Sequence, residues 1–140
     1  MSFDTINMPV ISLFYAGLLG VLYLVLAYGV IVVRRRERVG IGHGDSKALA
    51  IAVRIHGNFA EYVPFLLLML LMMELVGANP ILLHALGAGL FIGRILHALG
   101  LKQSAGTSVP RFVGMLLTFV VLLFSVGYLI GFAIARMWGG

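Results

Sequence analysis

The sequence contains no cysteine, and only 11% of its 140 residues are charged. The lack of cysteine excludes a disulfide framework, a thiolate nucleophile and a metal site with thiolate ligands. A soluble domain carries about 25% charged residues. The scarcity of charge, together with 61% hydrophobic residues, therefore indicates an integral membrane protein.

Acidic residues are few, five against ten Lys and Arg, which gives a formal net charge of +5. The excess is concentrated after the first apolar stretch, at Arg34, Arg35, Arg36, Arg38 and Lys47. A basic cluster in this position is a topology signal and suits anionic lipid head groups. No folded domain surrounds the cluster, which argues against nucleic-acid binding.

Four apolar stretches are long enough to cross a bilayer, since a membrane helix needs about 20 apolar residues. The first stretch is followed by positive charge and is too long for a cleaved signal peptide, so we expect it to be a true span. The predicted fold is an all-α, four-transmembrane-helix bundle forming a single domain over residues 1–140, with helices at about 8–33, 46–76, 80–101 and 109–137.

The connections between these helices predict the topology. The first contains the basic cluster and the third adds Lys102 and Arg111, whereas the second, around residues 77–80, has no Lys or Arg. The positive-inside rule then places the first and third connections in the cytoplasm and both termini outside it. The second and third helices form an antiparallel hairpin, and Asp45 or Ser46 can cap the second helix.

Two glycine pairs, Gly89–Gly93 and Gly127–Gly131, stand four residues apart in the third and fourth predicted helices. This spacing of small residues lets membrane helices approach each other closely. In a chain with 18 glycines the pattern is weak evidence, so it indicates candidate packing faces and no more.

Polar residues recur at helical spacing inside the second predicted helix. Arg54, Asn58 and Glu61 are separated by four and three positions. At about 100° per residue they lie within an arc of roughly 60° on one helix face. Arg94 and His97, three positions apart, form a second polar set in the third helix. Ionisable groups at such depth are costly and need a partner or a function.

Antiparallel packing brings both sets to a similar depth near the cytoplasmic ends of their helices, and Arg111 opens the fourth helix at the same membrane face. The sequence thus predicts a polar layer contributed by three helices. Three arginines against one glutamate make this layer net positive, which favours an anionic ligand and leaves Glu61 for an ammonium group. A metal site is disfavoured, because His56, His97 and Glu61 lack convergent spacing and arginines repel cations.

Each of these side chains also has a simpler structural interpretation. Arg54 can extend along its helix to the interface, where its charge meets water. Glu61 can form an ion pair with Arg54 or Arg94 that only fixes helix packing. Asn58 can join two helices, and His97 can be a packing residue. The convergence of these residues, rather than any one of them, predicts a site.

The second-helix residues resemble a known family signature. The run Arg54-Ile-His-Gly-Asn58-Phe-Ala-Glu61-Tyr-Val-Pro64 resembles that of the MAPEG family, membrane-associated proteins in eicosanoid and glutathione metabolism. Its Arg-x-His-x-Asn-x-x-Glu-x-x-Pro pattern is most similar to the microsomal glutathione transferase and bacterial branches. Arg94-Ile-Leu-His97 resembles the third-helix motif of that branch. Length, four spans and a basic first connection agree, so the resemblance covers essentially the whole chain.

The resemblance implies a homotrimer in a bacterial inner membrane, with glutathione bound between neighbouring subunits near the cytoplasmic face. The implied activity is transfer of glutathione to a lipophilic electrophile, or reduction of a lipid hydroperoxide, without a metal. Arg111 would stabilise the glutathione thiolate, although it can also be an interfacial anchor. The co-substrate glutathione would be held by the residues of the two motifs, Arg54, Asn58, Glu61, Arg94 and His97.

The sequence departs from the family pattern at Leu101. The leukotriene synthase branch, and many transferases, have a tyrosine at this position, seven residues after the third-helix arginine, so the departure argues against leukotriene synthesis. Other classes stay open. A non-catalytic lipid binder of the same fold would conjugate nothing, and a small four-helix transporter would need Glu61 more than the arginines. A purely structural membrane protein would tolerate the loss of any single polar residue.

Overall fold

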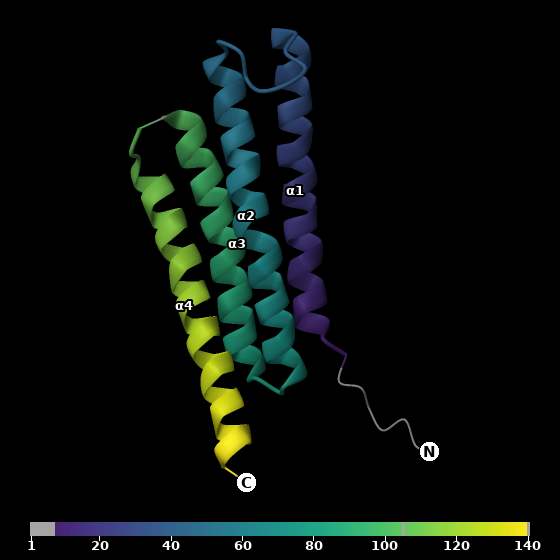
Figure 1. Cartoon of the computed structure of the whole chain (residues 1–140), viewed down its shortest axis with the longest axis vertical. Helices are drawn as coiled ribbons and strands as arrows, with labels where there is room; N and C mark the ends of the chain where they lie inside the picture. Colours follow the sequence, from purple (N-terminus) through teal and green to yellow (C-terminus); the bar gives the residue numbers. More distant parts are fainter. Residues whose placement is uncertain (1–7, 105, 140) are drawn as a thin grey trace.

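The computed structural model describes residues 8–104 and 106–139. This part of the chain forms four helices, α1 (Val10–Glu37), α2 (Lys47–Leu75), α3 (Pro80–Gln103) and α4 (Val109–Trp138). They lie side by side in an antiparallel bundle, with the α1–α2 and α3–α4 connections at one end and the α2–α3 turn at the other (Figure 1). All four are long and apolar enough to cross a membrane. The predicted all-α, four-transmembrane-helix fold is thereby confirmed.

The ends of the first two helices follow local sequence signals. α1 continues to Glu37 instead of ending near residue 33, and its last turn carries three arginines, which favour the negative end of the helix dipole. Of the two expected caps for α2, Ser46 and not Asp45 takes the role. Its hydroxyl accepts a hydrogen bond from the Leu49 backbone N–H at 3.2 Å.

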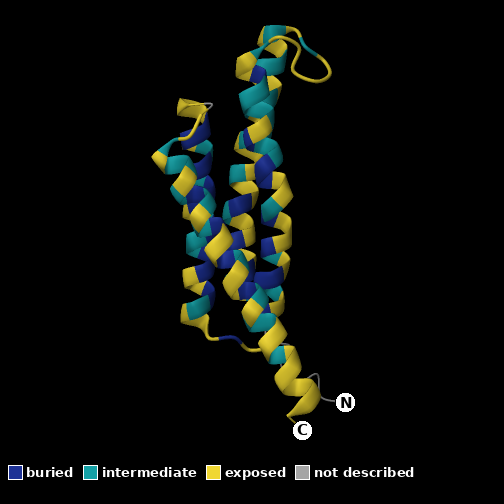
Figure 2. Ribbon diagram, turned by 60° about the vertical axis from the view of Figure 1, so that its left-hand side comes forward, coloured by how far each residue is buried: buried dark blue, intermediate teal, exposed yellow. Residues whose placement is uncertain are grey.

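Buried residues lie on the inward sides of the helices, while exposed residues cover the outer faces of the bundle (Figure 2). The core is apolar and includes Leu66, Met73, Leu83 and Leu90, each almost fully buried. The outer faces are apolar as well, and α1 in particular exposes large side chains such as Leu24. Lipid tails are as apolar as leucine, so this arrangement is that of a helix bundle surrounded by a bilayer.

Glycines let α3 and α4 pack backbone against backbone. A methyl group added at Gly114 would collide with the carbonyl oxygen of Gly93 and with the backbone of His97. One added at Gly100 would collide with the backbone of Arg111. The start of α4 is therefore held directly on the last turns of α3, which fixes Arg111 near the polar residues of α3.

Of the two glycine pairs that the sequence indicated as candidate packing faces, one lies at the α3–α4 contact and the other does not. Gly93 does lie in the close contact, and a Cβ added at Gly89 would lie 3.4 Å from the Val121 side chain, an ordinary packing distance. A side chain at Gly127 or Gly131 would meet no atom within 4 Å, and both glycines lie on the exposed side of α4. The pattern thus located the α3 side of the contact and missed the α4 side.

A polar cluster ties α1 to the α2–α3 hairpin at the other end of the bundle. The Glu74 carboxylate, at the end of α2, accepts hydrogen bonds from the backbone N–H groups of Ile11 and Ser12 at 2.9 and 2.7 Å. The first N–H groups of a helix have no partner within it, so a carboxylate from α2 caps α1. Beside it, the Tyr15 hydroxyl donates to the carbonyl oxygen of His84 at 3.1 Å.

We expect Gly114→Ala to lower the thermal stability of the detergent-solubilised protein, because the added methyl overlaps the Gly93 carbonyl and the His97 backbone. Overpacking of this kind typically costs about 1–3 kcal/mol. Gly127→Ala is the control, since it meets no atom within 4 Å and gains helix propensity. Size-exclusion profiles recorded after heating give the melting temperature of each variant. Equal melting temperatures for the two variants would contradict the close α3–α4 contact.

Glu74→Ala should also destabilise the bundle, because it leaves two backbone N–H groups of α1 without their carboxylate partner. A donor left unsatisfied away from water costs about 1–3 kcal/mol. Glu37→Ala is the matched control, since Glu37 pairs with Arg36 in an exposed ion pair, and such pairs contribute at most about 1 kcal/mol. The account of α1 capping fails if the two variants unfold at the same temperature.

Candidate functional site

Arg94 of α3 is the centre of the predicted polar layer and is only 1% exposed. Its Nη2 donates to Asn58 Oδ1 on α2 at 2.6 Å and lies 3.3 Å from His97 Nδ1. Because a guanidinium has only donors, that histidine nitrogen is the acceptor. Arg94 Nη1 lies 3.9 Å from the Met115 sulfur on α4. One buried side chain therefore contacts polar or polarisable atoms on α2, α3 and α4.

The environment of Arg94 leaves its charge incompletely compensated. Among the described residues its hydrogen-bond partners are Asn58, His97 and Met115 rather than a carboxylate, and its Nε has no partner at all. An arginine stays charged in proteins, and a buried charge without a counter-ion is costly. The incompletely compensated charge of Arg94 therefore favours an anionic ligand.

The two other predicted residues of α2 lie at the edge of this layer. Arg54 Nη1 and Glu61 Oε1 are 3.2 Å apart, and their side chains are 58% and 54% exposed. Asn58, between them in sequence, is buried. Of the two ion pairs considered from the sequence, the structure forms the one with Arg54.

Arg111 stands in the first turn of α4, with its backbone against Gly100 of α3. Its Nη1 donates to the Gly106 carbonyl oxygen at 3.0 Å. It lines a hollow of about 380 Å³ formed by the α3–α4 connection and the first turns of α4, together with Phe112 and Met115. Met115 both lines the hollow and lies 3.9 Å from Arg94 Nη1 through its sulfur.

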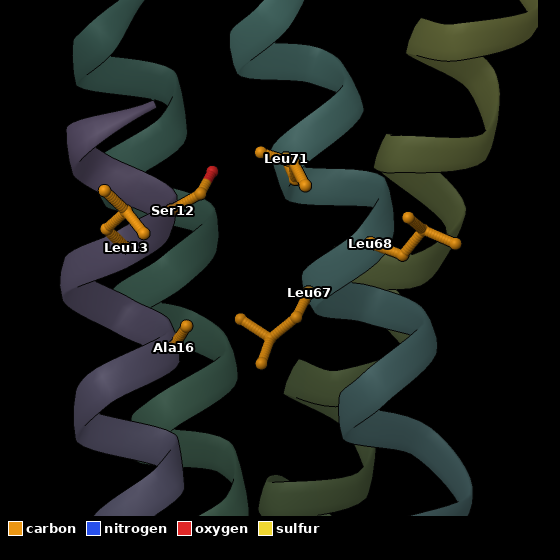
Figure 3. A pocket seen from close by; sticks show the side chains of 6 residues that line it. All are labelled: Ser12, Leu13, Ala16, Leu67, Leu68 and Leu71. Atoms are coloured by element: carbon orange, nitrogen blue, oxygen red, sulfur yellow. The ribbon is translucent and has the colours of Figure 1, made fainter. Parts of the chain in front are cut away.

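A second hollow, of about 180 Å³, lies between α1 and α2 and has a different character. Figure 3 shows Ser12, Leu13 and Ala16 of α1 on one side and three leucines of α2 on the other, Leu67, Leu68 and Leu71. Of the described residues that line this hollow, Ser12 alone has a polar side chain. A charged ligand would lose its hydration here without compensation, so this hollow does not suit an anion.

Two further residues complete the comparison with the sequence. His56, which was considered from the sequence as a metal ligand and disfavoured, packs its ring against Tyr23 of α1 with centroids 5.0 Å apart. It therefore lies outside the Arg94 cluster. Met115 was missed, although it follows Arg111 by four residues and such residues share a helix face. That spacing is the sequence signal that would have found it.

These observations define a four-helix integral membrane protein with a buried cationic site between α2, α3 and α4. The profile of the MAPEG family matches residues 12–131, and the chain belongs to this family. It is similar to "Inner membrane protein YecN" of Escherichia coli (strain K12), with 37% identity over 90 residues, which are 64% of this chain and 69% of that protein.

The protein of the same name from Escherichia coli O6:H1 (strain CFT073) matches to the same extent. No solved structure gives a significant match. Together with the four apolar helices, the similarity to the two inner membrane proteins supports a multi-pass inner membrane protein. The family match extends over all six residues predicted to form the site.

Asn58→Ala should reduce stability more than Arg54→Ala. The first change removes the 2.6 Å hydrogen bond of a buried guanidinium, and an unsatisfied buried donor costs about 1–3 kcal/mol or more when charged. The second removes an exposed pair worth at most about 1 kcal/mol. Thermal unfolding in detergent compares them directly. A larger loss for Arg54→Ala would show that Arg94 does not depend on Asn58.

Proposed function

We propose that this protein binds glutathione in the polar layer around Arg94 and transfers it to lipophilic electrophiles. The observation that carries the proposal is the fully buried guanidinium of Arg94, held by Asn58 and His97 without a carboxylate among the described residues. Such a group favours an anionic ligand. Membership of the MAPEG family supports a glutathione-related function.

The charges of the layer complement those of glutathione, which carries two carboxylates and one ammonium group. Arg94 and Arg54 are suited to the carboxylates through charge-assisted hydrogen bonds, and Glu61 is suited to the ammonium group. Arg54 and Glu61 would exchange their mutual contact for contacts with the ligand. Because their pair is about half exposed, that exchange costs little.

Arg111 would then act on the sulfur of the bound glutathione. A free thiol has a pKa of about 8.5 and is mostly protonated at neutral pH. Lowering the pKa by two units needs about 2.7 kcal/mol of differential stabilisation, which is within the range for a hydrogen bond to a charged group. The thiolate would attack an electrophile that arrives through the bilayer, and the same thiolate suits reduction of a lipid hydroperoxide.

We further propose that the protein acts as a homotrimer, in which a neighbouring subunit completes the site. Two features of the protomer support this assembly. The Arg54–Glu61 pair lies exposed at the protomer surface and not in the bundle interior. In addition, only 6% of the apolar span of α1 is buried within the protomer, which leaves a large apolar face for another subunit or for lipid.

A non-catalytic lipid binder is the second candidate, and the apolar hollow between α1 and α2 favours it. Such a protein would hold a lipophilic ligand without conjugating it. A proton-coupled transporter is less favoured, because the Glu61 side chain is 54% exposed and paired with Arg54 rather than isolated in the bundle.

Replacing Arg111 with alanine should lower the rate of glutathione conjugation far more than the affinity for glutathione. If the thiol pKa rises by two units, from about 6.5 to about 8.5, the thiolate fraction at pH 7 falls from roughly three quarters to about 3%, about 25-fold. Conjugation of a chromogenic aromatic electrophile, followed as glutathione is varied, separates turnover from affinity. Lys102→Ala, which removes a basic residue from the last turn of α3, is the control.

The possible outcomes of this assay are distinct. Unchanged turnover in a folded Arg111→Ala protein would refute the role of Arg111 in thiolate stabilisation. Arg111→Lys keeps the positive charge and should retain part of the activity, which separates the charge from the hydrogen bond to Gly106. A wild-type protein that binds glutathione and conjugates no electrophile would favour the non-catalytic candidate.

A further inference from the structure

The connection between α1 and α2 is internally braced by one arginine. Arg34 Nη1 donates to the carbonyl oxygens of Val39, Gly40 and Gly42 at 3.3, 3.3 and 2.8 Å. The backbone turns at Arg38, which has a φ of 58°. Arg38 is the C-cap of α1, where a left-handed residue commonly ends a helix. Arg34 thus orders the connection by donating to its carbonyl oxygens, and its guanidinium is occupied by the loop itself.

The remaining basic residues of the connection face outward. Arg35, Arg38 and Lys47 are exposed, and we call these three residues the basic loop patch. Arg36 is matched by Glu37, with Nε and Oε1 2.9 Å apart. Residues 34–47 contain five Lys or Arg against two acidic residues. The connection therefore presents a net positive surface on an ordered backbone.

The depth of the patch follows from the length of α1. Its 28 residues extend about 42 Å at 1.5 Å per residue. A bilayer is about 40–45 Å thick with its polar layers, of which about 30 Å is hydrocarbon. α1 and α2 also extend beyond the α3–α4 connection at this end (Figure 1). With the start of α1 at the opposite membrane surface, these lengths place the patch in the layer of the lipid head groups.

Exposed apolar side chains continue directly below the patch on α1. Tyr28, Ile31 and Val32 are 68%, 47% and 45% exposed. They stand one to two turns before Arg35, on the side of the hydrocarbon. A ligand that satisfies both surfaces needs an anionic head and an apolar chain, which distinguishes a lipid from a soluble anion or a nucleic acid.

We propose that the basic loop patch binds the phosphate groups of anionic phospholipids, whose acyl chains lie along the exposed end of α1. Arginine pairs with phosphate through bidentate, charge-assisted hydrogen bonds, and lysine adds a compact charge. Each basic residue near an anionic lipid surface strengthens binding roughly fivefold. The bound lipid fixes the depth of this end of the protein in the membrane, whatever ligand the Arg94 layer takes.

The test is lipid binding to the detergent-solubilised full chain, followed by native mass spectrometry. Phosphatidylglycerol and phosphatidylcholine of matched acyl chains are the two probes. The wild type should bind phosphatidylglycerol at least roughly tenfold more tightly. The double variant R35Q/R38Q should lose that preference, and R35K/R38K should keep most of it. R136Q is the control, because Arg136 is an exposed arginine in the last turn of α4, at the opposite end of the bundle.

Three results would overturn the proposal. The first is equal binding of the two lipids to the wild type, and the second is an unchanged preference in a folded R35Q/R38Q protein. The third is displacement of phosphatidylglycerol by an equal concentration of inorganic phosphate, which would reveal a site for a soluble anion. If R35Q/R38Q does not elute as a folded protein, K47Q carries the same test, because Lys47 is the exposed first residue of α2, whereas the loop carbonyls accept from Arg34.

Discussion

The hydrogen bond between Arg94 and Asn58 is the contact on which the geometry of the bundle depends. At 2.6 Å it joins α3 to α2 in the interior, and the same guanidinium reaches Met115 on α4. A charge at this depth is tolerated only when it faces the bundle, so it restricts the rotation and depth of three helices at once. The glycine contacts of α3 with α4 then determine where Arg111 lies.

The charged groups at the two ends of the bundle differ in how far their charge is compensated by neighbouring groups. At one end the Glu74 carboxylate is satisfied by two backbone N–H groups of α1, so it serves to hold helices together. At the other end Arg94 has polar partners but no carboxylate among the described residues. The compensated charge of Glu74 stabilises the fold, whereas the incompletely compensated charge of Arg94 favours binding of an anionic ligand. This contrast assigns the candidate site to the Arg94 end.

Much of this arrangement was predictable from the sequence. Apolar stretches located the four helices, and the antiparallel hairpin implied that Asn58, Arg94 and His97 would meet. The sequence did not show that Glu61 pairs with Arg54 at the surface, or that Gly114 lies against the backbone of α3. Both depend on the rotation and crossing of whole helices, which several contacts determine together. The orientation of the termini stays a prediction.

The central claim is that the polar layer binds glutathione, and calorimetric titration of the detergent-solubilised protein tests it most directly. Arg54→Ala and Glu61→Ala are suitable variants, because both side chains are more than half exposed and their loss leaves the interior intact. The account predicts saturable binding that weakens roughly tenfold or more in each variant, as expected for lost charged hydrogen bonds. A folded wild-type protein without saturable binding would contradict it.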